Sequence, residues 1–433
     1  MTDVLVGKPF YSVDDECSIV SSNMHVNGQD YQINYRVSNG PVSHTADASL
    51  AAGLFPAMKF GSDLRIEGTV SLKLLRATNT IQDIVKAWFP GYISISIGAD
   101  ISNRAESNNQ RGVGAFFSLG IDAFYTLLKH QNEITTLIFI HGFDIPLDNR
   151  VFRDRASRHV REVAAAFGKV LVEVETNLPE YLEKISPSFV PAGGDAHGAV
   201  LASIALLLSP QLKKVYIPSS NPYDVLIPTG SHPMLDPLWS TEDVEIVHDG
   251  CKTRVEKAAF IAQSEIALKN LRVCFFRPED GINCGQCEKC LRSMANLRAV
   301  GALDRCSSFR HKLDLEKLAK IQIPKGLLYN CYKSTLHTVE MNGNDPELAN
   351  ALHKCIKNYE YNKLAKELNE EMVQFLESSI GQKILKNRRN TIIKYLWHTD
   401  PEWMIKEVSK ESLKLADRKM FGGLINKLRN VRK

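Results

Sequence analysis

The clearest chemical signature in the sequence is a cluster of cysteines in one short segment. Four of the nine cysteines share this segment, and the last three are separated by two residues each: Cys274, Cys284, Cys287 and Cys290. Thiolates at this spacing can converge on one ion, and Gly285 allows a tight turn between two of them. The segment therefore predicts a structural zinc site with four sulfur ligands.

The sequence leaves two candidates for the fourth ligand. Cys274 is expected at the end of a short strand, and Cys306 is the alternative. Because sulfur would fill all four positions, the ion is expected to stabilise the fold and not to activate water. Cysteines crowded in this way indicate a metal site in a reducing compartment, the cytoplasm, and not a disulfide framework.

A candidate phosphate site lies between Val113 and His130. Val113–Phe117 is a short apolar run typical of a strand, and apolar residues at helical spacing begin at Phe124. Between them, Ser118–Ala123 turns the chain. A strand, tight turn and helix in this order aim free backbone N–H groups and the positive end of the helix at one point, where phosphate can bind. The alternative interpretation is an ordinary connection that holds no ligand.

The turn resembles the SGGxDS pyrophosphate loop of the PP-loop ATP pyrophosphatases. These parallel-sheet enzymes split ATP into AMP and pyrophosphate while activating a carbonyl or carboxylate. Ser118, Gly120 and Asp122 match the pattern. Leu119 replaces the first glycine, which would allow positive φ or a close approach of the backbone to phosphate. Ala123 replaces the final serine and lacks its hydroxyl.

The order of parts over residues 113–303, a phosphate loop followed by a cysteine knuckle, is similar to that of the 7-cyano-7-deazaguanine synthase family. The resemblance implies ATP and Mg²⁺ as cofactors, with the phosphates held by Ser118, Leu119, Gly120, Ile121, Asp122 and Ala123. It implies that Ile140 and His141 lie beside the adenine. The implied catalytic residues are Asp122 and a basic residue after the fifth strand of the domain, either Lys257 or Arg254.

Alternating strands and helices must position these residues. From residue 113 to about 303 the alternation predicts an α/β fold, a parallel sheet with helices on both faces. In such sheets ligands bind beyond the carboxyl ends of the strands. Polar residues follow four predicted strands, in the segments 118–122, 141–144, 219–221 and 248–250. We therefore expect these segments to meet at one ligand site.

The chain divides into three predicted domains. An N-terminal α+β domain covers 1–105, with a strand expected over 92–99. The PP-loop ATP-binding domain with its knuckle covers 106–303 and includes a helix expected over 255–268. A helical domain covers 304–433. Its expected helices include 345–358, 364–379 and 403–415.

Composition limits the functional classes. The chain of 433 residues is 44% hydrophobic and 24% charged, as in globular proteins with a large core. Its net charge of +4 does not indicate nucleic-acid binding. The longest apolar stretch, within 199–208, is too short to span a membrane. The expected partners are ATP and a small acyl substrate or a protein partner, and a homodimer is left open.

Two less specific features have both a functional and a structural interpretation. Asp195 and His197 precede a buried helix, where a capping role is preferred to catalysis. The proline-rich loop 230–241 contains His232, Asp236 and Trp239, and is either a substrate-reading loop or a packed surface loop.

Two functions are compatible with these patterns. The first is an ATP-dependent enzyme that adenylates an acyl or carboxylate substrate, after which a nitrogen nucleophile displaces AMP. The second is a catalytically inactive, zinc-stabilised module that binds a nucleotide or a partner, because Leu119 and Ala123 depart from the phosphate-loop pattern. The segments 1–105 and 304–433 lie outside the family pattern, so the substrate does not follow from the resemblance.

Overall fold

The computed structural model describes residues 4–15, 17–102, 110–190, 194–250, 252–274, 276–324 and 326–377. The chain divides into two compact units: Met1–Leu318 with Asn330–Ala349, and Ala319–Tyr329 with Asn350–Lys433. All described strands and all candidate site residues belong to the first unit. No described helix is long and apolar enough to cross a membrane.

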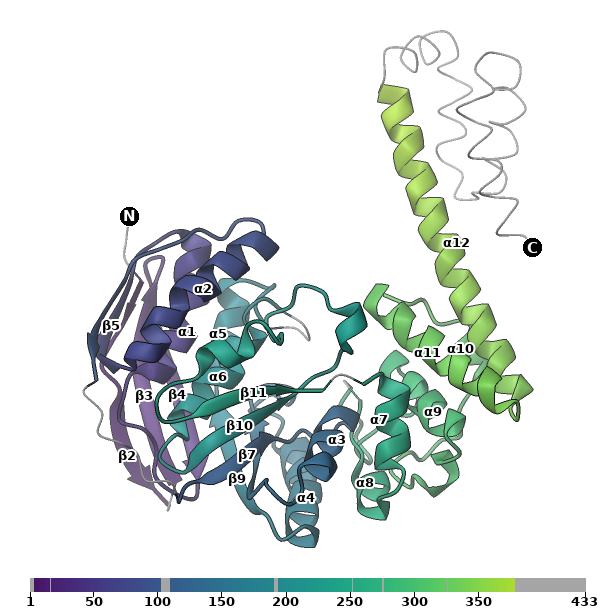
Figure 1. Cartoon of the computed structure of the whole chain (residues 1–433), viewed down its shortest axis with the longest axis horizontal. Helices are drawn as coiled ribbons and strands as arrows, with labels where there is room; N and C mark the ends of the chain where they lie inside the picture. Colours follow the sequence, from purple (N-terminus) through teal and green to yellow (C-terminus); the bar gives the residue numbers. More distant parts are fainter. Residues whose placement is uncertain are drawn as a thin grey trace. The chain divides into compact units, whose positions relative to one another are not determined.

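The described strands of the first unit form one sheet (Figure 1). Five neighbouring strands at one end of the sheet are parallel to one another, in the spatial order β11 (Glu245–Asp249), β10 (Leu212–Pro218), β7 (Gly112–Phe116), β8 (Thr136–His141) and β9 (Val170–Thr176). The central strands β7 and β8 are buried along nearly their whole length. Such continuous burial is expected for parallel strands covered on both faces, so the predicted α/β class is confirmed.

The N-terminal strands continue the same sheet. β9 pairs antiparallel with the first of them, with Tyr35 opposite Thr176. The order then runs β4 (Gln29–Ser38), β3 (Cys17–Val26), β1 (Val4–Val6), β5 (Leu64–Val70) and β6 (Ile97–Ile101), and β2 (Phe10–Asp14) pairs with β3. The domain boundary predicted near residue 105 therefore falls within one continuous sheet.

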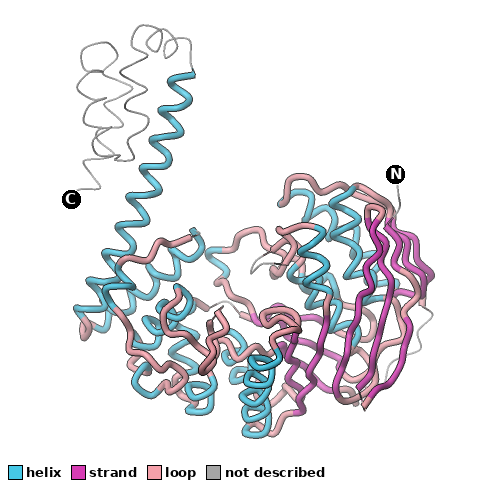
Figure 2. Tube along the Cα trace, turned by 180° about the vertical axis from the view of Figure 1, so that it is seen from behind, coloured by secondary structure: helices cyan, strands magenta, loops and turns pink. Residues whose placement is uncertain are grey.

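Helices cover both faces of the parallel strands (Figure 2). One face carries α1 (Asp47–Phe60), α5 (Leu178–Ile185) and α6 (His197–Leu207), with α2 (Leu72–Trp88) beside them. The other face carries α3 (Ile121–Lys129) and α4 (Arg150–Ala166). α6 is buried on all sides beyond its first residue because it packs against the sheet, against α1 and against the short 3-10 helix Asp236–Trp239. Along β3 and β4 buried residues alternate with more exposed ones, as in strands with one solvated face.

A second layer of helices lies over α3 and α4. α7 (Arg254–Ile261) packs on α3, α8 (Glu265–Asn270) packs on α4, and α9 (Glu288–Ala299) packs on α7. The remaining described helices are α10 (Leu315–Ala319), α11 (Gly326–Asn342) and α12 (Pro346–Glu377). The layer matters for function because it brings α7 and α9 to the carboxyl edge of the parallel strands, where α3 begins.

Three predicted elements of the first unit differ in the structure. The helix expected over 255–268 is two helices, because Ser264 interrupts it and caps α8 by accepting the N–H of Ala267 at 3.2 Å. The strand expected over 92–99 begins only at Ile97, since the N–H of Ile95 donates to Gln82 Oε1 instead of a neighbouring strand. Cys274 does not end a strand, and its N–H donates to the side chain of Asn283 at 3.2 Å.

Two of the helices predicted for the C-terminal segment lie largely within the described residues. The helices expected at 345–358 and 364–379 form a single helix, α12, without a break between them over the described residues. A break would need a helix-ending signal such as glycine or proline, and the intervening sequence has neither. The helix expected at 403–415 lies outside the described residues.

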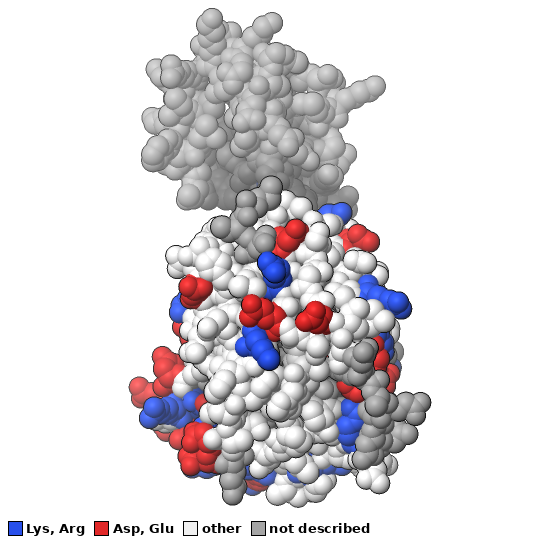
Figure 3. All heavy atoms as spheres, turned by 90° about the vertical axis from the view of Figure 1, so that its left-hand side faces the viewer, with Lys and Arg blue, Asp and Glu red and all other residues white. Residues whose placement is uncertain are grey.

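The side of the molecule shown in Figure 3 has no concentration of charge of one sign. Acidic and basic side chains are interspersed there on a largely uncharged surface. This view is consistent with the small net charge of +4. A field strong enough to attract nucleic acid would need basic residues clustered on one face.

Candidate functional site

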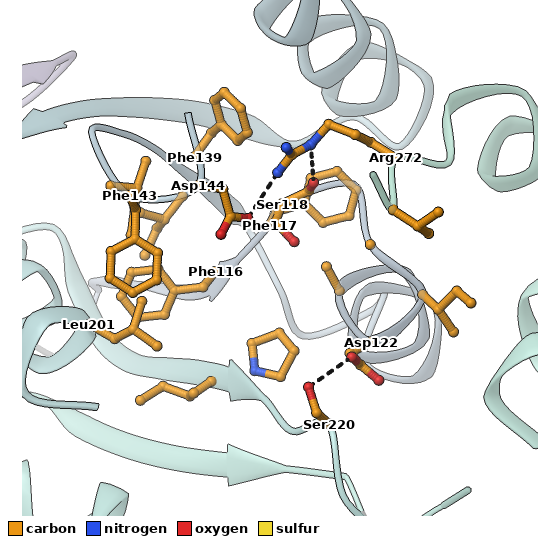
Figure 4. Close-up of a pocket in the computed structure, with 18 of the residues that line it drawn as sticks. Phe116, Phe117, Ser118, Asp122, Phe139, Phe143, Asp144, Leu201, Ser220 and Arg272 are labelled. Carbon is orange, nitrogen blue, oxygen red and sulfur yellow. Dashed lines mark hydrogen bonds and ion pairs between the residues drawn. The ribbon is translucent and has the colours of Figure 1, made fainter. Parts of the chain in front are cut away.

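A cavity of ≈ 210 Å³ lies at the carboxyl ends of β7, β8 and β10. One part of its wall is apolar and is formed by Phe116, Phe139, Ile140, Phe143, Leu201 and Ile217. The other part is polar and is formed by Ser118, Asp122, Asp144, Ser220, Arg254, Arg272 and Lys289. In Figure 4, Phe143 and Leu201 lie on one side of the cavity, and Asp122 and Ser220 lie on the other. A ligand that fits both parts has an apolar body and a charged end.

The turn after β7 has an unusual backbone conformation. Leu119 has a φ of 64°, in the left-handed region that a glycine adopts easily and an L-residue adopts at a cost of about 1–2 kcal/mol. Its side chain is fully buried, which contributes about 1.5–3 kcal/mol in compensation. The turn that glycine would make easily is thus made by a buried leucine, which does not itself line the cavity.

The N-terminus of α3 faces this cavity. Gly120 is the N-cap residue, and no side chain caps the helix there. The first helical hydrogen bond runs from Phe124 N–H to Gly120 O at 2.9 Å, so the N–H groups of the three preceding residues have no acceptor within the helix. Those residues, Ile121, Asp122 and Ala123, all line the cavity. Uncapped N–H groups at a helix N-terminus attract anions.

Two cations from α7 hold the carboxylate of Asp122. Arg254 Nη2 lies 3.0 Å from one carboxylate oxygen, and Lys257 Nζ lies 3.1 Å from the other. Ser220 Oγ also donates to this carboxylate, at 3.2 Å. Burial alone would raise the pKa of Asp122, but Arg254 and Lys257 lower it overall. Asp122 is therefore an anion at neutral pH.

The sequence of α7 explains how its two cations reach α3. Thr253 and Glu256 form a capping box that fixes the first turn of the helix. Arg254 and Lys257 are three residues apart and thus share one face, which packs against α3. Lys257 is completely buried, and Arg254 Nε is buried with no hydrogen-bond partner among the described residues. A buried guanidinium N–H without an acceptor is a place where a ligand could bind.

Two more cations come from the cysteine-rich segment. Arg272 Nη2 lies 3.0 Å from Asp144 Oδ2, and its Nε donates to Ser118 O at 3.2 Å (Figure 4). Lys289 lies in α9 and lines the cavity. Burial lowers the pKa of Lys289 to about 8, although the nearby carboxylate of Asp144 acts in the opposite direction. Its ammonium group is therefore mostly charged at neutral pH.

Positive charge exceeds negative charge in this group. Four cations, Arg254, Lys257, Arg272 and Lys289, accompany the two carboxylates Asp122 and Asp144, which leaves +2 for these six side chains without the neighbouring cysteines. Unbalanced charge in a partly buried site is costly unless an ion of opposite sign binds. Together with the N-terminus of α3, these cations suit an anionic ligand.

The structure brings four cysteines together beside the cavity. The sulfur atoms of Cys274, Cys284, Cys287 and Cys290 all lie within 4.8 Å of one another. Two Sγ–Sγ pairs are 3.9 Å apart, and a tetrahedral ion with bonds of about 2.3 Å would set them about 3.8 Å apart. The backbone N–H groups of three knuckle residues lie 3.3–3.4 Å from these sulfurs. The cluster could therefore bind a metal ion such as zinc.

Cys306, the alternative ligand, lies apart from this cluster. Its Sγ donates to Leu268 O at 3.1 Å and lies 3.4 Å from Ser308 Oγ. Burial raises the pKa of the Cys306 thiol, which favours the protonated form. Cys274 is the fourth member of the group, although it does not follow a strand.

Some predicted residues do not face the cavity. His141 ends β8, but its Nε2 lies 2.9 Å from Glu173 and 3.2 Å from Ser157 Oγ, on the side of the strand away from the cavity-lining Ile140. Asp249 ends β11 and accepts hydrogen bonds near the other end of α3. Successive side chains of a strand point to opposite faces, so these strand ends share an edge but not a site.

Asp195, His197 and the loop 230–241 have different surroundings in the structure. Asp195 does not cap α6, whose N-cap residue is Ala196, but accepts from Tyr92 Oη and Ser188 Oγ, at 2.9 Å each. His197, the first residue of α6, lines the cavity with its ring against Phe143 at 4.8 Å between centroids. The side chains of His232, Asp236 and Trp239 are all buried, so that part of the loop 230–241 is packed.

Sequence reasoning did not identify Arg272 or Lys289 as cavity residues. Both are close in sequence to cysteines of the cluster, since Arg272 comes two residues before Cys274 and Lys289 precedes Cys290. The feature of the sequence that could have identified them is the presence of charged residues within the cysteine-rich segment. The packing of that knuckle against the phosphate turn could not be deduced from their spacing.

No protein-family model matches the chain, and no curated protein and no solved structure matches it. The cavity and the four-cysteine cluster are thus the features from which a function can be inferred.

Proposed function

We propose that the cavity binds ATP and that the protein is an ATP-dependent enzyme of the PP-loop class. The observation that carries this proposal is the excess of buried positive charge around the uncapped N-terminus of α3, next to an apolar wall. A triphosphate would neutralise the charge, and a purine would pack on the apolar wall. The resemblance of Ser118–Ala123 to a pyrophosphate loop supports the same assignment.

The proposed binding mode follows from the two parts of the cavity wall. The adenine packs beside Phe116, Ile140 and Phe143, while the phosphates bind the N–H groups of α3 and Arg254. Lys257 does not line the cavity and acts through Asp122, whose carboxylate it contacts. Mg²⁺ accompanies the phosphates and offsets part of their charge. Ligand cavities usually measure roughly 300–1,000 Å³, so a cavity of ≈ 210 Å³ encloses part of ATP and leaves the rest at its mouth.

The proposed reaction is the adenylation of an acyl or carboxylate substrate. An acyl oxygen attacks the α-phosphorus of ATP, the bond to the β-phosphate oxygen breaks, and pyrophosphate leaves. A nitrogen nucleophile then attacks the acyl carbon and displaces AMP, forming a C–N bond. The protein contributes alignment and stabilisation of the developing negative charge, through Lys257 and Arg254.

The four-cysteine cluster is proposed to hold a structural zinc ion. Four thiolates fill the tetrahedral coordination of Zn²⁺ and leave no position for water, so the ion has no direct part in the reaction. Thiolate ligands of this kind persist in a reducing compartment, which supports a cytoplasmic location.

A nucleotide-binding module without catalysis is the second candidate. It is favoured by the engagement of both carboxylate oxygens of Asp122, which Arg254, Lys257 and Ser220 hold away from an incoming magnesium ion. The absence of a hydroxyl at Ala123 points in the same direction.

ATP binding can be tested with a charge placed at the helix N-terminus. Gly120 has ordinary backbone angles, and a Cβ there would meet only the Ser118 hydroxyl at 3.3 Å and Arg272 O at 3.9 Å. Asp and Asn are both favoured at an N-cap, so both variants should fold. Calorimetric titration with ATP and Mg²⁺ should show binding to wild type and to Gly120→Asn, and none to Gly120→Asp. Equal affinities for the two variants would overturn the phosphate site.

Catalysis is tested separately by exchange of labelled pyrophosphate into ATP with a panel of carboxylic acids. We expect exchange in wild type and its loss in Lys257→Ala and Asp122→Ala. ATP binding without exchange for any acid would instead assign the protein to the non-catalytic module.

A further inference from the structure

One short segment physically connects the cysteine cluster to the phosphate turn. Cys274 belongs to the cluster, and two residues earlier the backbone N–H of Arg272 donates to Leu119 O at 2.9 Å. The accepting residue is the one with positive φ. The segment therefore holds the strained position of the turn at one end and a metal ligand at the other.

The side chain of Arg272 adds two contacts to this connection. Its Nε donates to Ser118 O at 3.2 Å, and its Nη2 lies 3.0 Å from Asp144 Oδ2, as Figure 4 shows. The side chain of Arg272 is only 6% exposed, whereas that of its partner Asp144 is 44% exposed. One residue thus binds two successive carbonyls of the turn and the loop after β8.

Asn283 fastens the same segment to the knuckle. Its Oδ1 accepts from Val273 N–H at 2.8 Å and from Cys274 N–H at 3.2 Å, and its Nδ2 donates to Leu271 O at 2.7 Å. Asn283 is buried and directly precedes the metal-binding Cys284. The main chain around Arg272 is therefore positioned by residues that a bound metal would hold in place.

We propose that Arg272 is a positioning residue through which metal occupancy of the four-cysteine cluster sets the conformation of the phosphate turn and its affinity for anions. The inference deepens the proposed function, since it rests on the metal site and the phosphate site described above. With metal bound, the segment 271–274 is held in place and its N–H stabilises Leu119. Without metal, the four sulfurs lose their common ligand, the segment loosens, and Leu119 can leave its costly conformation.

Such coupling is reciprocal. If metal strengthens nucleotide binding, nucleotide must strengthen metal binding by the same factor. Couplings between two sites are commonly about 5- to 150-fold, and three hydrogen bonds from one buried residue place this one on the order of tenfold. Loss of Arg272 contacts should uncouple the sites without emptying the metal site.

Hydrogen exchange at the turn tests the coupling without any nucleotide. Phe117 N–H donates to Ile138 O and Phe124 N–H donates to Gly120 O, so these two amides report on both sides of the turn. Chelation of the metal should speed their exchange at least tenfold, while the β3–β4 hairpin (residues 17–38) should not change. Unchanged exchange at Phe117 and Phe124 after metal loss would overturn the inference.

Three variants separate positioning from general stability. Arg272→Gln should show fast exchange at the turn even with metal bound, and Arg272→Lys should restore part of the protection. Arg277→Gln is the matched control, because Arg277 lies in the same loop, is exposed, and donates to the main chain of Asp144, at 2.8 Å. Cobalt substitution should produce the same thiolate absorption spectrum in all of them. An altered spectrum in Arg272→Gln would assign that residue to the metal site itself.

Titration with ATP and Mg²⁺ then distinguishes the two proposals. We expect metal-loaded wild type to bind about tenfold more tightly than the metal-free protein, and Arg272→Gln to lose that difference. Equal affinity with and without metal would overturn the coupling and leave ATP binding intact. Metal-dependent protection of the turn without ATP binding to the loaded protein would retain the coupling and overturn the nucleotide assignment.

Discussion

Asp122 and Asp249 lie beside opposite ends of the same helix, α3, in different electrostatic surroundings. Asp249 accepts from Thr126 Oγ1 at 2.7 Å and Lys129 Nζ at 2.6 Å, and lies 2.9 Å from His130 Nε2. Its carboxylate is buried within these partners, which come from the last turns of the helix. Asp122 is instead shared by two cations at the uncapped N-terminus, where a cavity begins.

These surroundings distinguish a carboxylate that stabilises the fold, Asp249, from one that lies at a candidate ligand site, Asp122. Asp249 is enclosed by donors and ties β11 to α3. Asp122 lies where cations outnumber carboxylates and where the first N–H groups of α3 have no acceptor within the helix. A polar residue at a strand end is thus a weak indication of a site. Excess charge beside a cavity is a stronger one, because a ligand is what would complete it.

The substitution Lys257→Met is expected to change ATP affinity most. The change removes a fully buried cation and leaves Asp122 with one ion partner, Arg254. Breaking a buried pair costs about 3–5 kcal/mol, and ATP affinity measured by calorimetry should fall at least 100-fold. Lys129→Met is the control at the other end of α3, where the side chain is 37% exposed. If both variants lost ATP binding equally, the two ends of α3 would not differ in function.

Asp249→Ala should reduce stability without affecting the ligand. The change leaves Lys129, His130 and Thr126 without their common acceptor, and we expect a loss of about 3 kcal/mol in the free energy of unfolding. Urea denaturation measures this loss. ATP affinity should stay within about twofold of wild type at a temperature where the variant is folded. A tenfold loss of affinity would show that Asp249 also shapes the cavity.

A third carboxylate, Glu173, binds His141 away from the cavity and, like Asp249, is expected to stabilise the fold. Its contribution can be measured from the pH dependence of stability. Burial would raise its pKa, but His141, Ser157 and Arg161 lower it from 4.5 to about 2. A pKa lower in the folded state means that the stabilisation is complete above about pH 4.5 and is lost as the pH falls toward 2. Glu173→Gln should flatten the stability profile in that window. A profile parallel to that of wild type would contradict this.

The smallest expected effect is an increase in ATP affinity in the variant Ala123→Ser. Ala123 lines the cavity in the first turn of α3, and a serine hydroxyl there could donate to a phosphate oxygen. One added hydrogen bond contributes about 0.5–1.5 kcal/mol, or a gain of about 2- to 10-fold in ATP affinity. Ala123→Cys is the control of similar size with a weak donor. A serine variant that binds no better than the cysteine variant would place the phosphates away from Ala123.

Local features of the fold and site were predictable from sequence. The spacing of Cys284, Cys287 and Cys290 anticipates their convergence, and the strand, turn and helix around Ser118 occur where expected. The alternation after residue 113 anticipates the parallel strands. The joining of the N-terminal strands to the same sheet was not predictable, because pairing between Tyr35 and Thr176 depends on residues far apart in the chain.

The sequence by itself determined what short segments can do: bind a metal with closely spaced thiols and present helix N–H groups after a turn. Only the tertiary structure decided which side chains meet. It turned His141 and Asp249 away from the cavity, and it brought Arg272 and Lys289 to it through the packing of the cysteine knuckle. The physical reason is that bonded geometry relates neighbours in sequence, whereas the face and register of packed elements relate residues far apart in it.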